Sequence, residues 1–400
     1  MDLPRPVYPE ALELAWLRRA MDATGSDSPE TACDRLARRV AALSDLFTVE
    51  RRSGFEQYAA DPIHWAAYGL FFFPQTYVRI RFVLAECAAI AGGPPLPDDG
   101  AVTVADLGAG SGAAGRAAID WLQEAGVRRP LRWIAVDRHA AALGELATLA
   151  GRPGRGRRVR VQTVVADVRS WRPDKPADLV LAAFVVNELF EGASEEEFVR
   201  WLDRCVGMVR HGGWLVVVEP ATRPSSVRLE RARDRLLGRD DVSLLAPCPH
   251  RRPCPLLALG RPNAWCHDVR RWNAPLSLRW MNRRLHRDLS AVAYSFLAVR
   301  RSPPPPDEPD AFRGRLVGAV RPTAGRIASH LCASDGSTCP CEVLTRHLDR
   351  AEARRIVEEW ERGDRVRLDD PTRLGNGALR GARMERLLGF APAAGPGHSE

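Results

Sequence analysis

The 400-residue chain has a single lysine, Lys175, and no run of the roughly 18 apolar residues that a membrane-spanning helix needs. We therefore expect no membrane partner. Its 45% hydrophobic and 27% charged residues are ordinary for a globular chain and exclude disordered, collagenous and coiled-coil proteins. Residues 1–14 contain several acids and no apolar segment, which is typical neither of a secretory signal nor of a transit peptide. From this we expect a cytoplasmic, bacterial protein.

Basic residues outnumber acidic ones by 58 to 50, which gives a net charge of +8, and nearly all of the positive charge is arginine. A GC-rich genome favours arginine codons and would explain this without any function. Alternatively, the chain has a phosphate-bearing partner, because the guanidinium group stays charged and binds phosphate oxygens in a bidentate way. Net charge alone does not separate these explanations.

The nine cysteines fall into two kinds. Cys33, Cys87 and Cys205 stand alone in helical or apolar surroundings, so we expect them in the core. In a reducing compartment, clustered cysteines indicate metal or redox chemistry rather than disulfides. The clustered ones are Cys248, Cys254, Cys266, Cys332, Cys339 and Cys341.

Composition and periodicity divide the chain into three regions. Residues 1–98 form an N-terminal helical region, in which Pro74 is expected to open a helix. Residues 99–301 alternate between near-continuous apolar strands and helices, which predicts a parallel sheet covered on both faces. Residues 302–400 follow a stiff proline linker and predict a small α+β region, including a helix that begins after Asp349. The strands expected in the middle region are 101–108, 131–137, 160–167, 178–186, 213–220 and 292–301.

A glycine-rich loop follows the first expected strand and precedes a helix, an arrangement that lets a ligand approach the backbone beside a helix N-terminus. An acid two residues before the first glycine suits a cationic sulfonium ligand better than a pyrophosphate. Two further acids end the next two strands, where carboxylates can take ribose hydroxyls and contact an adenine amine. The expected cofactor-binding residues are Asp106, Gly108, Gly110, Gly112, Asp137 and Asp167.

This order of loop, acids and strands resembles class I S-adenosylmethionine-dependent methyltransferases, which have a Rossmann-like α/β sheet. A nicotinamide-dependent enzyme, or a doubly wound domain whose glycines serve only the turn, are the alternatives. Methyl transfer is mostly a matter of holding donor and acceptor in line, so it needs few obligatory residues. Asn187 and Glu188, after the fourth strand, are candidates to face the methyl group, or they cap the next helix.

The first cysteine cluster lies in a Cys-rich insertion, residues 240–285. Its three thiols, with one from the distant cluster, complete a four-cysteine set for an iron–sulfur cluster or zinc. The fourth ligand is open between Cys332, Cys339 and Cys341, and ordinary reduced cysteines are the remaining alternative.

The run LAPCPHRRPCP…WCH, with DLGAGSGAA before it and SHLCASDGS after it, resembles the methyltransferase-like small-ribosomal-subunit proteins. That family includes mitochondrial small-subunit assembly factors and bacterial relatives, and FFPQTY, FVVNELF and VVEPATRPSSVRLERARDRLL extend the likeness over most of residues 60–340. The resemblance implies S-adenosylmethionine, small-subunit ribosomal RNA or a small-subunit precursor as partner, and a 4Fe–4S cluster. The ligands that it implies are Cys248, Cys254, Cys266 and Cys332.

Two functions follow from these observations. One is a methyltransferase that acts on small-subunit ribosomal RNA; the other is a non-catalytic iron–sulfur assembly factor that retains the cofactor pocket. In either case we expect a monomer off the ribosome, and an RNA face made by arginines interleaved with rings that stack on unpaired bases. The residues expected there are Arg223, Arg228, Arg231, Arg233, Arg235, Arg251, Arg252, Trp265, Arg270, Arg271 and Trp272.

Overall fold

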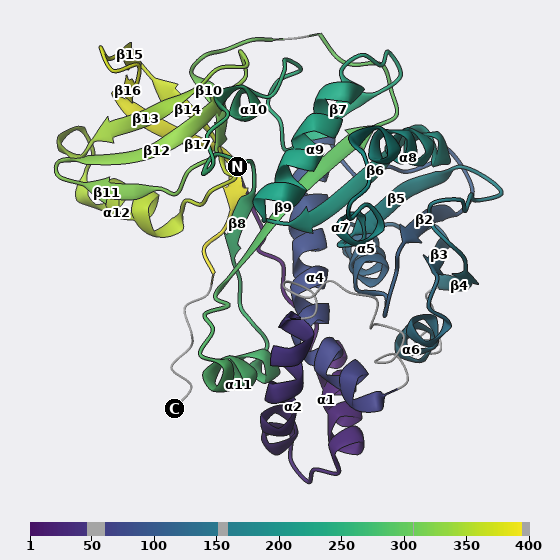
Figure 1. Ribbon diagram of the computed structural model, residues 1–400. Helices are drawn as coiled ribbons and strands as arrows, with labels where there is room; N and C mark the ends of the chain where they lie inside the picture. Colours follow the sequence, from purple (N-terminus) through teal and green to yellow (C-terminus); the bar gives the residue numbers. More distant parts are fainter. Residues whose placement is uncertain (46–60, 151–158, 307, 394–400) are drawn as a thin grey trace.

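The computed structural model describes residues 1–45, 61–150, 159–306 and 308–393. Figure 1 shows two sheets side by side, with a group of helices below them and the long helix α4 running between. The sheet on the right is called the central sheet here, and the one on the left the C-terminal sheet.

The central sheet has the order β4-β3-β2-β5-β6-β9-β7, with β8 paired to β9, among the described residues. Strands β4 to β6 are parallel, whereas β9 runs antiparallel between β6 and β7. The parallel part follows the 3-2-1-4-5 order of a doubly wound sheet, but the antiparallel β9 replaces the sixth parallel strand of a dinucleotide-binding sheet. Its strands are β2 (Val102–Leu107), β3 (Leu131–Asp137), β4 (Val159–Val165), β5 (Ala177–Ala183), β6 (Val209–Pro220), β7 (Ser243–Ala246), β8 (Asp268–Arg271) and β9 (Ala291–Arg300).

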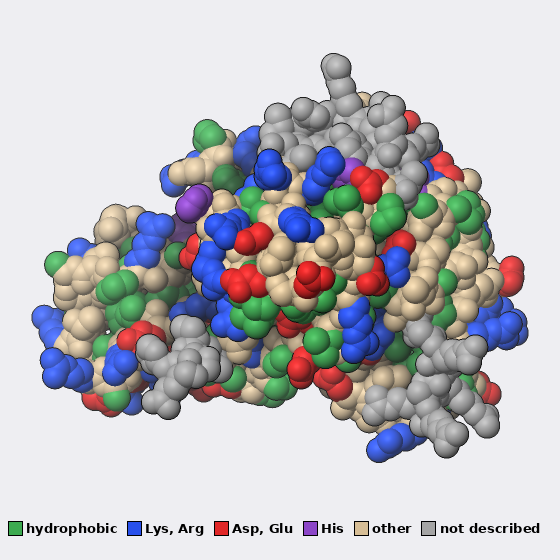
Figure 2. All heavy atoms as spheres, turned by 90° about the horizontal axis from the view of Figure 1, so that it is seen from below, with side chains coloured by type: hydrophobic (Ala, Val, Ile, Leu, Met, Phe, Trp, Pro, Cys, Tyr) green, Lys and Arg blue, Asp and Glu red, His purple; other side chains and the backbone are tan. Residues whose placement is uncertain are grey.

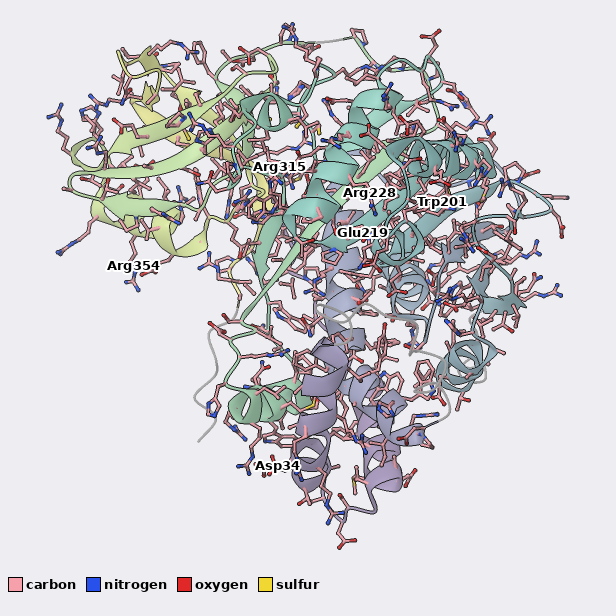
Figure 3. All side chains as sticks on the ribbon, in the orientation of Figure 1. Asp34, Trp201, Glu219, Arg228, Arg315 and Arg354 are labelled. Carbon is pink, nitrogen blue, oxygen red and sulfur yellow. The ribbon has the colours of Figure 1, made fainter. Side chains whose placement is uncertain are left out.

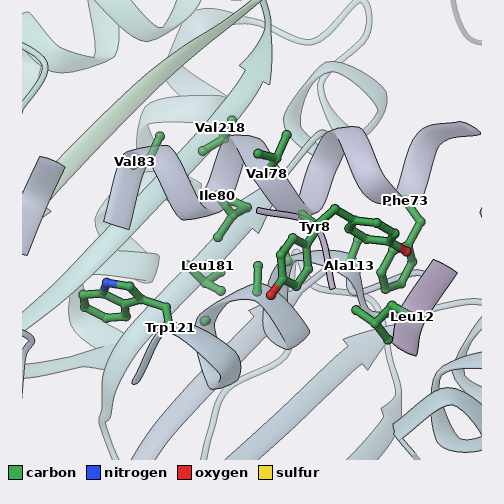
Figure 4. Packing of buried hydrophobic residues seen from close by; sticks show 14 of the residues in the cluster. Tyr8, Leu12, Phe73, Val78, Ile80, Val83, Ala113, Trp121, Leu181 and Val218 are labelled. Atoms are coloured by element: carbon green, nitrogen blue, oxygen red, sulfur yellow. The ribbon is translucent and has the colours of Figure 1, made fainter. Parts of the chain in front are cut away.

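Both faces of the central sheet are covered, as the apolar strands predicted. Along β5, Leu179 and Leu181 pack in one core with α4 and α5, while Val180 and Ala182 pack in a second core with α8 and α9. Figure 4 shows the first core, where α4 lies across the strands. The flanking helices are α5 (Ala113–Glu124), α6 (Ala140–Ala150), α7 (Val186–Leu189), α8 (Glu195–Met208) and α9 (Arg223–Leu236).

The N-terminal region is helical, with α1 (Glu10–Thr24), α2 (Pro29–Asp45) and α4 (Pro62–Ala91). Pro74 does not open a helix, contrary to expectation; it lies inside α4, which begins after the N-cap Asp61. A proline in a helix removes one backbone hydrogen bond, and burial of nearly the whole apolar circumference of α4 outweighs that loss. No helix in the described part of the chain is both long and apolar enough to span a membrane.

The Cys-rich segment is partly built into the central sheet, because β7 and β8 both pair with β9. Between and after these strands lie α10 (Pro255–Leu259) and α11 (Leu276–Leu285). The three thiols of this segment therefore start from a sheet edge and from α10, rather than from a loop that projects freely into solvent.

The C-terminal sheet has the order β1-β17-β14-β10-β12-β13-β16-β15, with β11 on β12, among the described residues. Its strand β1 is Asp2–Leu3, which pairs in parallel with β17, so the first residues of the chain close the last sheet. The other elements are β10 (Arg313–Leu316), β11 (Arg321–Thr323), β12 (Arg326–Ala333), β13 (Thr338–Leu344), η2 (Thr345–His347), α12 (Arg350–Glu359), β14 (Arg365–Asp369), β15 (Thr372–Arg373), β16 (Leu379–Gly381) and β17 (Arg383–Phe390).

Candidate functional site

The glycine loop joins β2 to α5 at the carboxyl edge of the central sheet. Gly108 has φ 71° and donates its N–H to the carbonyl of Val136 at 2.8 Å. A Cβ atom on Gly108 would lie 2.4 Å from the Val185 side chain, so any other residue would displace the chain after β5. Gly110 has φ 53° and a Cβ there would meet open space, which leaves this turn accessible to a ligand.

Two carboxylates flank this turn from neighbouring parallel strands. Asp106 on β2 is buried and accepts a hydrogen bond from the N–H of Gly115 at 2.9 Å. Asp137 at the end of β3 accepts from the N–H groups of Gly110 and His139, both at 2.8 Å. Burial raises the pKa of Asp106 to about 7. Asp106 is therefore a carboxyl group of this site whose protonation changes near neutral pH.

The Ser111 hydroxyl is buried in the same loop, and it has no hydrogen-bond partner among the described residues. Buried polar atoms are normally satisfied, so a hydroxyl without an acceptor or donor is a sign of space for a ligand. The donors and acceptors of the loop therefore fit a polar cofactor that lies beside Gly110 and Asp137.

Helix α4 adds a residue to this site that the strand-and-loop pattern did not reveal. Burial raises the pKa of Tyr68, and the nearby carboxylates of Glu188, Asp137 and Asp106 add to this shift. One aromatic residue of α4 therefore lies among the acids of both the glycine loop and the loop after β5. The signal was present in the run FFPQTY and its surroundings, but only as an apolar helix.

Asp167 lies two residues after β4, at the same edge of the sheet. Its carboxylate is partly exposed and forms an ion pair with Arg169 at 2.6 Å. The hydrogen bond from Arg169 lowers the pKa of Asp167. Asp167 is thus charged and reachable, but it already has a cationic partner.

The loop after β5 is held by a buried acid at the end of β6. Glu219 accepts hydrogen bonds from the N–H groups of Val186, at 2.8 Å, and Asn187, at 3.1 Å. With its side-chain amide assigned the orientation that satisfies both ends, Asn187 donates to Glu219 at 3.0 Å and to the carbonyl of Phe184 at 3.1 Å. Both N–H groups of Asn187 are thus used to hold the loop, whereas Glu188 is exposed. Arg228 of α9, which Figure 3 labels beside Glu219, is a nearby cation that opposes the rise that burial causes in the pKa of Glu219.

A second site lies between the two sheets. A small cavity of about 40 Å³ is lined by four thiols, of which three come from the Cys-rich segment and one, Cys332, from β12 of the C-terminal sheet. Cys339 and Cys341 are instead in the core of the C-terminal sheet. The structure therefore brings Cys332, rather than the other two, to the local three, which are Cys248, Cys254 and Cys266.

Helix α9 fixes the cysteine loops through three consecutive polar contacts. Asp234 accepts from the N–H of Cys254 at 3.0 Å, and Glu230 accepts from the N–H of Cys266. Between them the buried Arg233 donates to the carbonyl of His250 at 2.6 Å and lies 3.3 Å from the Cys248 sulfur. Helix α9 thereby holds the loops that carry all three thiols of the Cys-rich segment.

Histidine also reaches this cavity. The N–H of Arg252 donates to Nδ1 of His250 at 3.1 Å, which leaves Nε2 to carry the proton. That Nε2 lies 3.6 Å from the sulfur of Cys332. Among the described residues no three His, Cys, Asp or Glu side chains converge closely enough to hold a metal ion. The four thiols therefore line one cavity without converging on a single point in this structure.

The expected RNA face is wrong in part. Arg233 and Arg270 are 2% and 1% exposed, and Trp272 is buried as well. Arg270 is held by Asp364, and Arg271 by Glu361 at 3.0 Å, because charges taken out of water must be paired. These three arginines hold the protein together. The exposed members of the set are Arg223, Arg231, Arg235 and Arg252.

Surface charge on the helical end of the molecule is mixed. Figure 2 shows arginine and acidic side chains interspersed on the face seen from below. Arg284 pairs there with Asp34 at 2.6 Å, and Arg283 with Glu30 at 3.3 Å, which joins α11 to α2. The surplus of positive charge does not form one patch on this face.

Comparison with known proteins identifies the family. Residues 62–367 match the model of the family described as mitochondrial small ribosomal subunit Rsm22. The match covers the central sheet, part of the C-terminal sheet and all four thiols of the cavity. The chain belongs to the Rsm22 family. The resemblance to methyltransferase-like small-ribosomal-subunit proteins is thereby confirmed.

Among curated proteins, this Rsm22 family member is similar to the human ribosome assembly protein METTL17, mitochondrial, with 29% identity over 249 residues. The match covers 58% of this chain and 48% of that protein, so the chain spans about half the length of the curated relative. The expected bacterial cytoplasmic location is wrong, because both the family and this relative are described as mitochondrial. The composition of residues 1–14 was therefore no guide to the location of the protein. In the structure, Asp2 and Leu3 of that segment form a strand of the C-terminal sheet.

Solved structures with some likeness to the Rsm22 family member are methyltransferases. N-methyltransferase NodS from Bradyrhizobium japonicum WM9, in complex with S-adenosyl-L-homocysteine, has 12% identity and a TM-score of 0.37 over 63% of this chain and 98% of its own. Magnesium protoporphyrin IX methyltransferase from Synechocystis, with bound SAM, has 13% identity and a TM-score of 0.36 over 66% and 97%. The description of the central sheet as methyltransferase-like rests on its own strand order.

Proposed function

We propose that this Rsm22 family member binds S-adenosylmethionine and small-subunit ribosomal RNA and acts in assembly of the small ribosomal subunit. The observation that carries the cofactor is the pair of carboxylates, Asp106 and Asp137, on either side of the open Gly110 turn. Family membership and the assembly role printed for the human relative support the ribosomal partner.

In this proposal Asp137 takes the ribose hydroxyls, because each of its oxygens accepts only one backbone N–H and retains a second lone pair. Asp106 faces the cationic amino-acid end, Gly108 and Gly112 shape the turn, and Ser111 supplies its unused hydroxyl. Asp167 contacts the adenine amine, in competition with Arg169. When bound, the cofactor supplies a methyl group on a sulfonium centre.

Methyl transfer to the RNA is the second candidate. Glu188 supports this candidate. It is exposed in the loop after β5, and its charge raises the pKa of Tyr68, as do the charges of the two cofactor-site acids. Asn187 has only its side-chain oxygen left for an incoming amine, because its N–H groups hold the loop. Catalysis would therefore rest on positioning rather than on a nucleophile.

We further propose a 4Fe–4S cluster on Cys248, Cys254, Cys266 and Cys332, with zinc as the alternative. The four thiols around one cavity support it, and so do the buried Arg233 and Arg315, whose positive charges line the same cavity. A cluster with four thiolates is anionic, and burial without nearby cations would be costly. The four cysteines would hold the cluster between the two sheets, and the cluster would thereby link one sheet to the other.

The decisive experiment is mass-spectrometric mapping of small-subunit RNA from cells that lack the protein, beside a profile of subunit assembly. A missing methyl mark, restored by the wild-type protein, supports the enzyme. An unchanged map with slow assembly supports the binding protein. Normal assembly together with no calorimetric binding of S-adenosylmethionine would contradict the proposal.

Sedimentation of the purified protein tests the expected monomer.

A further inference from the structure

One face of α4 is partly exposed along its length, in a helix that is otherwise buried. The partly exposed positions 68, 72, 76 and 79 recur at helical spacing and run from the cofactor site towards the β5 loop. Tyr68 and Phe72 have ring centroids 5.5 Å apart, and Arg79 ends the stripe. The stripe thus combines rings with a cation.

Arg79 has few partners for a charge at this depth. Its Nη2 donates one long hydrogen bond to Gln75 at 3.3 Å, and its Nε is buried with no hydrogen bond among the described residues. In the described part of the chain no carboxylate lies within 4.0 Å of its guanidinium, a distance at which ion pairs are recognised. Burial lowers the pKa of Arg79 to about 10, and the Tyr294 hydroxyl group opposes that shift only in part.

The buried arginines Arg81 and Arg315, in contrast, have carboxylate partners. Arg81, two residues further along the same helix, pairs with Glu124 and lies over the Tyr77 ring at 5.8 Å. Arg315 pairs with Glu86 and Asp268. Buried charges are normally paired, and one without a partner carries a cost that an incoming anion can relieve.

The position of Arg79 indicates where that anion would come from. Its guanidinium lies over the ring of Phe184 at 5.2 Å. Phe184 has φ 58°, which is unusual for a residue other than glycine, and its carbonyl accepts from Asn187. Arg79 is therefore against the loop on which an RNA acceptor would lie in the proposed function.

We propose that Arg79 is an oxyanion subsite beside the β5 loop, which takes a backbone phosphate of the RNA or the carboxylate of the cofactor. This inference rests on the proposed function for the identity of the ligand. A guanidinium that is already held over a ring loses little freedom on binding, and its hydrogen bonds to an anion are charge-assisted.

The test uses the full-length protein with Arg79→Met, Arg79→Lys and, as a matched control on the same helix, Arg81→Met. Probes are a single-stranded oligouridylate titrated at several salt concentrations, S-adenosylmethionine in a calorimeter, and urea unfolding with and without inorganic phosphate. For Arg79→Met we expect about tenfold weaker RNA binding, and a log–log salt slope smaller by about 0.7, because one phosphate contact is lost. Arg79→Lys should retain most of the slope.

The stability readout separates this role from a structural one. Arg79→Met should unfold at the same or a higher urea concentration, since it removes a partly buried charge that has no carboxylate partner among the described residues. Arg81→Met should unfold earlier and leave the RNA slope unchanged. Weaker cofactor binding with unchanged RNA binding would support the subsite and assign it to the carboxylate. Earlier unfolding of Arg79→Met with both affinities unchanged would overturn the subsite.

Phosphate distinguishes failure of the subsite from failure of the proposed function. If the wild-type protein binds no RNA, the proposed function fails while the subsite is still tested. Phosphate should then raise the urea midpoint of the wild-type protein more than that of Arg79→Met, since its general salting effect is common to both. Equal shifts would overturn the subsite.

Discussion

The two candidate sites of this Rsm22 family member are built in opposite ways. In the cofactor site, Asp106 accepts from Gly115 and Asp137 from Gly110, contacts that span 9 and 27 residues within one β-α-β unit. In the thiol cavity, Cys332 on the C-terminal sheet meets cysteines that precede it by 66 residues or more. The first site forms with a single unit of secondary structure, and the second forms only when two sheets dock.

Buried ion pairs lie at the junction of the two sheets. Arg315 of β10 donates to Glu86 of α4 at 3.1 Å and to Asp268 of β8 at 2.6 Å, so it joins all three regions of the chain. Figure 3 shows Arg315 at the junction between the two sheets, whereas Arg354 projects from the far side of the C-terminal sheet. Arg315 also lines the thiol cavity, so the cavity and the junction share a residue.

The largest effect is expected from removing the thiol that the C-terminal sheet supplies. Cys332→Ser should lose all of about four irons per chain in protein purified without oxygen, as should Cys248→Ser, because each cubane iron takes one thiolate. Iron analysis and the visible spectrum measure this. Cys339→Ser and Cys341→Ser are the controls and should keep the iron. About one zinc per chain in colourless wild-type protein would contradict the iron–sulfur cluster, while the assignment of the four cysteine ligands would stand.

The second-largest effect is expected from breaking the ion pairs at the junction between the two sheets. Arg315→Met leaves Glu86 and Asp268 buried without their cation, which should lower the free energy of unfolding by about 3–5 kcal/mol. Urea unfolding followed by fluorescence measures this. Arg354→Met, which removes an exposed pair with Glu358, is the control and should stay within about 0.5 kcal/mol. Equal losses in the two variants would mean that the junction is not what holds the sheets.

The local site should respond independently of the junction. Asp137→Ala should weaken binding of S-adenosylmethionine by about ten- to a hundredfold, roughly 1.5–3 kcal/mol, since it removes hydrogen bonds to a charged acceptor. Calorimetry measures the affinity, and circular dichroism checks the fold. Asp167→Ala should cost less, because that carboxylate is already shared with Arg169. An unchanged affinity in Asp137→Ala would show that the ribose lies elsewhere.

The smallest effect is a pH dependence at Asp106. Because burial raises its pKa to about 7, the carboxyl group must lose its proton to receive a cationic ligand. Affinity for S-adenosylmethionine should fall about tenfold per pH unit below 7 and level off above it. The same shift means that the ligand-free protein gains stability as pH falls from 7 towards 4, since the folded state there binds the extra proton.

An Asp106→Asn variant checks both trends. It should bind the cofactor more weakly with a flat profile between pH 5 and 7, and its stability should lose the corresponding slope. A profile in Asp106→Asn that matches the wild-type protein would assign the titration to another group.

Local physics explains what could be predicted. The apolar strands at 131–137 and 213–220, the helix after Asp349 and the covered parallel sheet were all foreseen, because hydrophobic periodicity and capping act over a few residues. Pro74 was misjudged for the same reason: the energy that tolerates a proline inside α4 comes from packing on strands far along the chain. The burial of Arg233 and Arg270 could not be predicted, because the sequence does not show which distant groups the fold brings within hydrogen-bonding distance of an arginine.

The amino-acid sequence by itself determined the family and the ingredients of both candidate sites: the acids at strand ends, the glycines and the four cysteines. Only the tertiary structure decided that β1 closes the C-terminal sheet, that Cys332 rather than Cys339 or Cys341 reaches the cavity, and that Arg79 has no carboxylate among the described residues. Each of these depends on which distant segments become neighbours. That choice is made by the summed burial of whole faces, which no short stretch of residues encodes.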